Sequence, residues 1–370
     1  MSQVEIATAD SSLEARQLSV VLGGHEVLNI PSLAIERDGV LVIIGPNGSG
    51  KTTLLLSLAL LLKPAKGNIY YRNKPVNYGA ESLRLRRHFA VLFQEPLLLS
   101  GTVWDNVTLG LRLRHVGKQE IKTKAAKWLE RFGIAELARR QAKTLSGGEA
   151  KRVSLARAFV LEPEVLFLDE PFAALDTPTH QNLVEDFQAV LHETKISTVM
   201  VTHQIEEALI LGDRVAVLIN GRIRQMGTAR EVFSTPLDED VAAFIKGGNI
   251  IHGAILSQSE GLVVIEVGQQ KIEAVSDLQA GNKVVLFLHY DDITISNVIG
   301  EPAQTSARNH LTGTITHVFP LGSQARVTVD CSFPLTALIT WRSYEELGLE
   351  IGREVTVSFK ATSVRIIKAG

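Results

Sequence analysis

The chain has 370 residues, 21% of them charged, and a formal net charge of −2 at pH 7. This length allows two or three domains, and the balanced charge supplies no global basic field for nucleic acid or an anionic membrane. The single cysteine, Cys331, excludes an internal disulfide and is typical of a reducing compartment. The longest apolar run, residues 54–62, is far shorter than the roughly 20 residues that span a bilayer, so any membrane role requires a partner.

Residues 1–246 alternate short β-branched runs with helical patterns, which predicts an α/β domain with a parallel sheet. The runs at 40–44, 165–168 and 198–201 each lead into a glycine or a polar residue. The segment at about 95–145 differs, because it is rich in leucine and helix formers. We therefore expect a helical subdomain inserted into the α/β core.

A glycine-rich segment, residues 45–52, fits the pattern G-x-x-x-x-G-K-[ST] between a strand and a helix. In such a phosphate loop, backbone N–H groups and the helix N-terminus hold phosphate. Lys51 is expected to reach the β- and γ-phosphates of a nucleotide, and the Thr52 hydroxyl to ligate Mg²⁺. The predicted nucleotide-binding residues are Gly45, Pro46, Asn47, Gly48, Ser49, Gly50, Lys51, Thr52 and Thr53.

Further polar residues follow the predicted strands. Asp169 is expected to hold Mg²⁺ and Glu170 to act as the general base on the attacking water. His203 follows another strand and is placed to contact the γ-phosphate and Glu170. Gln94 can reach both Mg²⁺ and the attacking water, and it begins the helical subdomain.

A second anion site is predicted at Ser146-Gly147-Gly148, which opens a helix and therefore presents free backbone N–H groups. Since residues 45–52 already supply a phosphate site, this turn is best used on the ATP of another subunit. The economical arrangement is a head-to-tail homodimer with each ATP between one phosphate loop and the partner's Ser-Gly-Gly turn. Asp176 is expected at the same interface.

Residues 247–370 have a different character, dominated by β-branched residues and frequent turns. Residues 249–255 align with 309–315, and the strand after Gly281 matches the one after Gly352. We interpret this domain as two repeats, 249–296 and 306–370, of a small oligonucleotide/oligosaccharide-binding (OB) type of barrel.

Six motifs over about residues 15–245 resemble the nucleotide-binding subunit of an ABC transporter. In chain order they are the phosphate loop, Gln94, Leu-Ser-Gly-Gly, Leu-Asp-Glu-Pro, Ala-Leu-Asp and Thr-His. The resemblance implies a P-loop ATPase core that converts ATP and water to ADP and phosphate, with ATP and Mg²⁺ as its ligands. It also implies a homodimer at the cytoplasmic face of the membrane, beneath a separate permease that docks near Gln94 and residues 96–104. An extracytoplasmic solute-binding protein would act indirectly, and no nucleic acid is expected.

The C-terminal region is similar to the accessory TOBE barrels of importer ATPases. Residues 305–309 and 360–364 resemble the molybdate/tungstate-binding Mop domain, in which hydroxyls, N–H groups and lysine bind oxyanions. The candidate oxyanion residues are Ser306, Arg308, Lys360 and Ser363. The first repeat has residues 289–293 at the position of 360–364, and we expect it to lack such a site. The resulting prediction is an importer of tungstate or molybdate.

Other functions fit parts of this pattern. The same machine could import sulfate, ferric ion or a polyamine. A soluble ABC ATPase of translation or DNA repair generally carries two cassettes or a long coiled-coil insertion, and this chain has one cassette and neither feature. An oxyanion store with a vestigial ATPase conflicts with the complete set of ATPase residues.

The chain departs from the family pattern at three positions. Leu22 stands where an aromatic residue usually stacks on adenine. Glu149 replaces a frequent glutamine, and Gln204 replaces a common aspartate.

Overall fold

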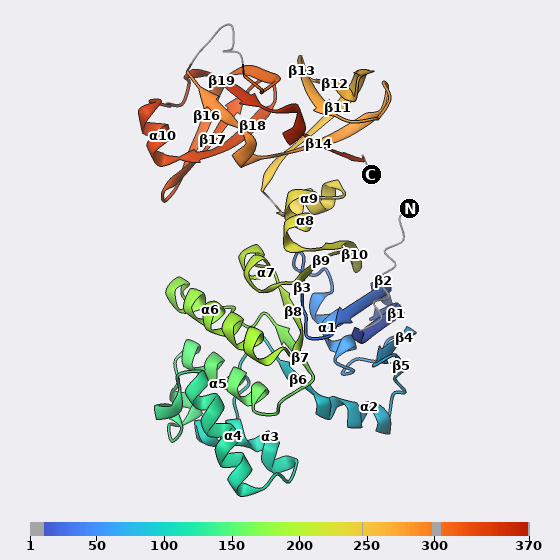
Figure 1. Ribbon diagram of the computed structural model, residues 1–370, viewed down its shortest axis with the longest axis vertical. Coiled ribbons are helices and arrows are strands. Elements are labelled where there is room, and N and C mark those ends of the chain that lie inside the picture. The colour runs from blue at the N-terminus through green and yellow to red at the C-terminus, as the bar shows by residue number, and fades with distance from the viewer. Residues whose placement is uncertain (1–10, 246, 298–304, 369–370) are drawn as a thin grey trace. The chain divides into compact units, whose positions relative to one another are not determined.

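The computed structural model describes residues 11–245, 247–297 and 305–368 (Figure 1). The chain folds into two compact units, Met1–Val232 and Phe233–Gly370. Helix α9 (Glu239–Ile245) belongs to the second unit, where it packs on strand β11 (Gly248–Ser259). The domain boundary predicted at 246 comes directly after this helix.

A six-stranded sheet forms the centre of the first unit, in the order β10-β9-β3-β8-β7-β6. Strands β9, β3, β8, β7 and β6 run parallel, whereas β10 pairs with β9 antiparallel. Every residue of β3, β7 and β8 is buried, as expected for parallel strands covered on both faces. The strands are β3 (Val40–Ile44), β6 (Phe89–Leu92), β7 (Val165–Asp169), β8 (Ser197–Thr202), β9 (Arg214–Ile219) and β10 (Arg222–Gly227).

A second sheet of the first unit is antiparallel, in the order β2-β1-β4-β5. One hydrophobic cluster joins side chains of this sheet, including Leu13 and Leu28, to Leu54 and Leu58 of α1 (Lys51–Leu58) and to Phe167 of β7. The helix that begins at Lys51 is therefore held in place by apolar packing against both sheets. The strands are β1 (Ser11–Leu22), β2 (His25–Glu36), β4 (Lys66–Tyr71) and β5 (Lys74–Pro75).

The helical subdomain groups α3, α4 and α5 (Figure 1). The rings of Trp128, Phe132 and Phe159 pack together in its core and are all nearly inaccessible to solvent. Within the described residues, no helix combines the length and apolarity needed to cross a membrane. Besides α1, the helices up to residue 234 are α2 (Ala80–Leu85), α3 (Val103–Leu113), α4 (Lys118–Arg131), α5 (Gly147–Phe159), α6 (Thr177–Thr194), α7 (Ile205–Leu211) and α8 (Ala229–Ser234), the last of which crosses the boundary between the units.

The second unit contains two five-stranded sheets, ordered β13-β12-β11-β14-β20 and β15-β19-β16-β17-β18. A single hydrophobic cluster draws side chains from both sheets. Besides β11, its elements are β12 (Leu262–Val267), β13 (Gln270–Val275), β14 (Lys283–His289), β15 (Thr294–Ser296), β16 (Asn309–Leu321), β17 (Gln324–Asp330), β18 (Pro334–Thr340), α10 (Trp341–Glu346), β19 (Glu354–Phe359) and β20 (Arg365–Lys368).

The two repeats exchange their last strands. Strand β15 ends the first repeat but pairs with β19, and β20 ends the second repeat but pairs with β14. The repeated asparagines also cross over: the Asn249 amide bonds both backbone groups of Thr336 at 2.9 and 2.7 Å, and the Asn309 amide bonds those of Glu273 at 3.0 and 2.7 Å. Each repeat is therefore completed by the other.

Candidate functional site

The candidate nucleotide site lies at the carboxyl edge of the central sheet. Strands β3, β8, β7 and β6 are parallel neighbours, so the residues that follow them lie along one edge. Those residues are Gly45, His203, Glu170 and, two positions beyond β6, Gln94. The fold thus gathers four predicted site residues that are far apart in the sequence.

The phosphate loop passes so close to its neighbours that two positions must be glycine. A Cβ atom on Gly45 would lie 2.0 Å from the Leu218 carbonyl oxygen. Gly50 has a φ of +99°, and its Cβ would lie 2.7 Å from Leu28 Cδ2. The Ser49 hydroxyl is buried and has no hydrogen-bond partner among the described residues, as suits a donor reserved for phosphate.

Lys51 is 7% exposed, and its Nζ donates to the carbonyls of Gly45 at 2.9 Å and Pro46 at 3.1 Å. An ammonium has three donors, so one N–H remains for a phosphate oxygen. Burial lowers the pKa of Lys51, and the carboxylates of Glu170 and Asp169 oppose this shift. The loop therefore holds a cation in place before any nucleotide binds.

Thr52 and Asp169 place two oxygen donors side by side, with Thr52 Oγ1 3.1 Å from Asp169 Oδ1. Burial raises the pKa of Asp169 above its usual value, and the hydrogen bond from the Thr52 hydroxyl offsets only part of this rise. Mg²⁺ prefers oxygen ligands and is held by few protein groups in nucleotide sites. This pair therefore fits Mg²⁺ beside the phosphates.

Glu170 and His203 form a contact of 3.0 Å between Oε1 and Nδ1. Glu170 has a φ of +43°, which is a strained backbone conformation for a residue other than glycine. Its N–H donates to the Val201 carbonyl at 2.9 Å, and this hydrogen bond helps to hold the conformation. Non-glycine residues in this conformation cluster at functional sites. The Glu170 carboxylate thus lies beside His203, directly after the end of β7.

The Ser146 turn begins α5 with a capping box. The Glu149 N–H donates to Ser146 Oγ at 3.3 Å, and the Ser146 N–H donates to Glu149 Oε2 at 2.7 Å. Glu149, a departure from the family pattern, thus stabilises the turn. A Cβ on Gly148 would lie 2.8 Å from Thr179 Cγ2, and the Thr179 N–H caps onto Asp176 at 3.3 Å. The starts of α5 and α6 are therefore neighbours.

A cavity of about 560 Å³ in the second unit contains three of the four oxyanion candidates, Ser306, Lys360 and Ser363. Arg308 does not line it, and its guanidinium contacts Glu273 at 3.3 Å instead. Sequence reasoning missed the hydroxyls of β15 and β19 that also line the cavity, and those of β15 reach it only because this strand of the first repeat pairs with β19. It also missed two carboxylates. The additional polar residues are Asp291, Asp292, Thr294, Ser296, Thr305, His310, Thr356 and Ser358.

His310 has both ring nitrogens engaged in this cavity. Nε2 lies 2.8 Å from the Ala307 carbonyl, which can only accept, so Nε2 carries the proton. Nδ1 lies 2.9 Å from Ser358 Oγ and accepts a hydrogen bond from this hydroxyl. The position of His310 beside the repeated Asn309 was the available sequence signal.

The corresponding face of the first repeat is closed. Val285 and Phe287 of β14 stand where β19 has Thr356 and Ser358, and they pack in an apolar cluster with Ala242 of α9. The expected lack of an oxyanion site in the first repeat stays a prediction, and this apolar packing supports it.

Comparisons with known proteins match both units. The ABC transporter family model matches residues 28–173, and the TOBE domain model matches residues 305–366. The molybdate/tungstate import ATP-binding protein WtpC of Pyrococcus abyssi is 38% identical over 90% of this chain and 94% of the relative. The chain belongs to the ABC transporter ATP-binding proteins.

More distant members of this ATP-binding family include the spermidine/putrescine import protein PotA of Borreliella afzelii, 30% identical over 93% of this chain and 94% of the relative. The sulfate/thiosulfate import protein CysA of Nitrosomonas europaea is 31% identical over 94% of this chain and 95% of the relative. A solved structure of cbiO1 from Clostridium perfringens, part of an ABC transporter complex, superposes with a TM-score of 0.58 at 33% identity, covering 61% of this chain and 91% of that one.

A dimeric ATP-binding cassette solved after hydrolysis, with ADP and phosphate, superposes with a TM-score of 0.54 at 28% identity over 59% of this chain and 99% of that one. The predicted fold class and ATPase family are thereby confirmed.

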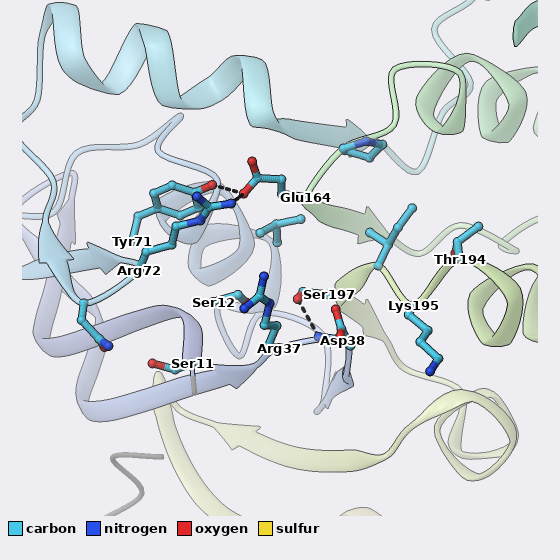
Figure 2. Close-up of a pocket in the computed structure, with 14 residues that line it drawn as sticks. Ser11, Ser12, Arg37, Asp38, Tyr71, Arg72, Glu164, Thr194, Lys195 and Ser197 are labelled. Atoms are coloured by element: carbon cyan, nitrogen blue, oxygen red, sulfur yellow. Dashed lines mark hydrogen bonds and ion pairs between the residues drawn. The ribbon is translucent and has the colours of Figure 1, made fainter. Parts of the chain in front are cut away.

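A second cavity of this ATP-binding protein, about 450 Å³ in volume, lies at the amino ends of β7 and β8 (Figure 2). It is therefore at the edge of the sheet opposite the phosphate loop. Glu164 accepts hydrogen bonds there from Tyr71 and, at 2.6 Å, from Arg72, and it contacts His88 at 2.8 Å. Because Glu164 pairs with Tyr71 and Arg72 of the cavity wall and with His88 beside it, this cluster links β4, η1 (Arg86–His88) and the start of β7.

Glu164→Gln is expected to destabilise the chain at pH 7 but not near pH 3. Burial raises the pKa of Glu164, but bonds from Tyr71 and His88 and the charge of Arg72 outweigh it and hold the pKa below 4.5. A carboxyl group whose pKa is lower in the folded state than in the unfolded state stabilises the fold at pH values above its unfolded-state pKa. This stabilisation is lost as the pH falls through the folded-state pKa. With Glu164 35% exposed, solvent screening limits the effect to about 1 kcal/mol. Melting temperatures of both proteins between pH 7 and pH 3 test this, and parallel curves would contradict it.

Proposed function

We propose that this chain hydrolyses ATP at the carboxyl edge of its central sheet to power import of molybdate or tungstate through a separate permease. The observation that carries the ATPase site is the strained Glu170 held 3.0 Å from His203, beside the Thr52–Asp169 pair. The observation that favours the solute is the 38% identity to a molybdate/tungstate import protein over nearly the whole chain.

Hydrolysis follows from the positions of these groups. The phosphate loop and Lys51 bind the β- and γ-phosphates. Thr52 and Asp169, with Gln94, would hold Mg²⁺, which neutralises phosphate charge when bound. Glu170 takes a proton from water as the water oxygen attacks the γ-phosphorus, and the bond to the ADP oxygen breaks. His203 orients the Glu170 carboxylate and contacts the γ-phosphate.

The active form is proposed to be a homodimer. The Ser146-Gly147-Gly148 turn presents N–H groups at the start of α5, and Asp176 lies close to it at the start of α6. In a head-to-tail pair, this surface closes over the ATP bound by the partner's phosphate loop. The dimeric cassette that superposes on the first unit supports this arrangement. The chain then works at the cytoplasmic face of the membrane, bound to its permease and served by an external solute-binding protein.

The cavity of the second unit is proposed to bind the imported oxyanion. Ser306, Ser363 and Lys360 supply hydroxyl and ammonium donors to a dianion. Asp291 and Asp292 line the same cavity and favour a second candidate, a polyamine, since carboxylates attract ammonium groups. Relatives that import spermidine and putrescine support this alternative.

Calorimetry of the full chain separates the two candidates. We expect tungstate and molybdate to release heat on binding, and sulfate and spermidine to release none. Lys360→Met is expected to weaken tungstate binding about tenfold, since one hydrogen bond from a charged group contributes roughly 1.5 kcal/mol or more. Lys283→Met, at the start of β14 and outside the cavity, is the control. Heat with spermidine alone would reverse the assignment, and no heat with any solute would leave the cavity without a ligand.

A further inference from the structure

Side chains on one face of helix α5 form hydrogen bonds with the loop that follows β6. Ser154 Oγ donates to the Pro96 carbonyl at 2.9 Å, and the Arg157 guanidinium donates to Pro96 at 2.8 Å and to Leu97 at 2.9 Å. Lys151 Nζ donates to the Gln94 carbonyl. Side chains three residues apart share a helix face. The side chains of Lys151, Ser154 and Arg157 therefore all donate hydrogen bonds to backbone carbonyls between residues 94 and 97.

Lys151 and Ser154 are buried and Arg157 is half-buried, so the contacts of the first two residues are costly to break. Lys151 is 4% exposed, and burial lowers its pKa while the carboxylates of Glu170, Asp169 and Glu207 oppose that shift. A buried ammonium must keep its hydrogen-bond partner. Burial also lowers the pKa of Arg157. Moving the loop away from α5 would leave the buried ammonium of Lys151 without its hydrogen-bond partner.

The helix and the loop each carry a residue of the proposed site. Helix α5 begins at the Ser146 turn, which faces the partner's ATP in the proposed dimer, and the loop begins at Gln94, which serves the chain's own ATP. A helix moves as a stiff element, so a displacement of its first turn also displaces the side chains farther along it. Lys151, Ser154 and Arg157 would pass that displacement to Gln94.

We propose that Lys151, Ser154 and Arg157 are positioning residues that make Gln94 move with α5. Each subunit then completes its own catalytic site only when its α5 has closed on the ATP of the other subunit. This inference rests on the proposed roles of Gln94 and the Ser146 turn. It gives a physical route by which the two nucleotide sites act together.

The test uses steady-state hydrolysis and ATP binding by the full chain. Lys151→Met is expected to lower kcat about tenfold, as small misplacements near a reacting centre do, and to leave ATP affinity within about threefold. Lys151→Arg, which keeps a charged donor, should restore most of the rate. Arg152→Met is the matched control on α5, since Arg152 contacts Asp186 at 2.6 Å and the Phe132 carbonyl at 3.3 Å rather than the loop.

Ser154→Ala separates positioning from a field effect of Lys151 on Glu170. Ser154 is uncharged and its hydroxyl donates to the loop backbone at Pro96, so a kcat about threefold lower with unchanged ATP affinity supports positioning. The proposal is overturned if Ser154→Ala and Lys151→Met keep the wild-type kcat, or if Arg152→Met loses as much. Failure of the proposed ATPase itself would be visible earlier, as wild-type protein that binds ATP without hydrolysing it.

Discussion

Glu170→Gln is expected to bind ATP as tightly as the wild type and to hydrolyse it about a thousandfold more slowly, within the range of general-base contributions. The substitution keeps the size of the side chain and its contact with His203 but removes the carboxylate that accepts the proton. The strained backbone at Glu170, with a φ of +43°, is unchanged, so the loop geometry persists.

The same variant should accumulate as an ATP-bound dimer, because the proposed sandwich opens only after hydrolysis. Light scattering with and without ATP and Mg²⁺ measures this, and phosphate release measures the rate. Glu206→Gln, an exposed carboxylate in α7, serves as the control and should behave as wild type. A Glu170→Gln variant that turns over at the wild-type rate would exclude Glu170 as the base.

The motifs of the first unit could be predicted because each one is local. The phosphate loop, Asp169-Glu170 and the Ser146 turn all lie where a strand or helix begins or ends, and those boundaries are set by short-range patterns. The meeting of the phosphate loop and Asp169-Glu170 at one edge followed from parallel strands alone. The role of Glu149 could not be predicted, since its reciprocal hydrogen bonds with Ser146 depend on the precise geometry of the turn.

The second unit was harder, because its organisation depends on pairings far apart in the sequence. The repeat was visible in Asn249 and Asn309, but each asparagine bonds a strand of the other repeat. Strand exchange placed β15 hydroxyls in the cavity, and Arg308 contacts Glu273 instead of lining it. A side chain's neighbour in the sequence did not reveal its neighbour in space.

Lys51→Ala is expected to abolish ATP binding, with a loss of affinity of at least about 100-fold, since hydrogen bonds from a charged donor to phosphate contribute roughly 1.5–3 kcal/mol each. Lys51 is fixed by the Gly45 and Pro46 carbonyls, so its ammonium is already oriented when ATP arrives. Alanine leaves those carbonyls without their donor and leaves Asp169 and Glu170 without a neighbouring cation.

The measurement is the increase in melting temperature that ATP and Mg²⁺ cause, because a ligand stabilises only the state that binds it. The wild type should show a concentration-dependent increase, and Lys51→Ala should show none. Lys122→Ala, an exposed lysine of α4, controls for the general loss of a cation. Undiminished stabilisation of Lys51→Ala by ATP would mean that the nucleotide binds elsewhere. In that case the strain at Glu170 and the Thr52–Asp169 pair would need another explanation, because both were assigned by their position beside this loop.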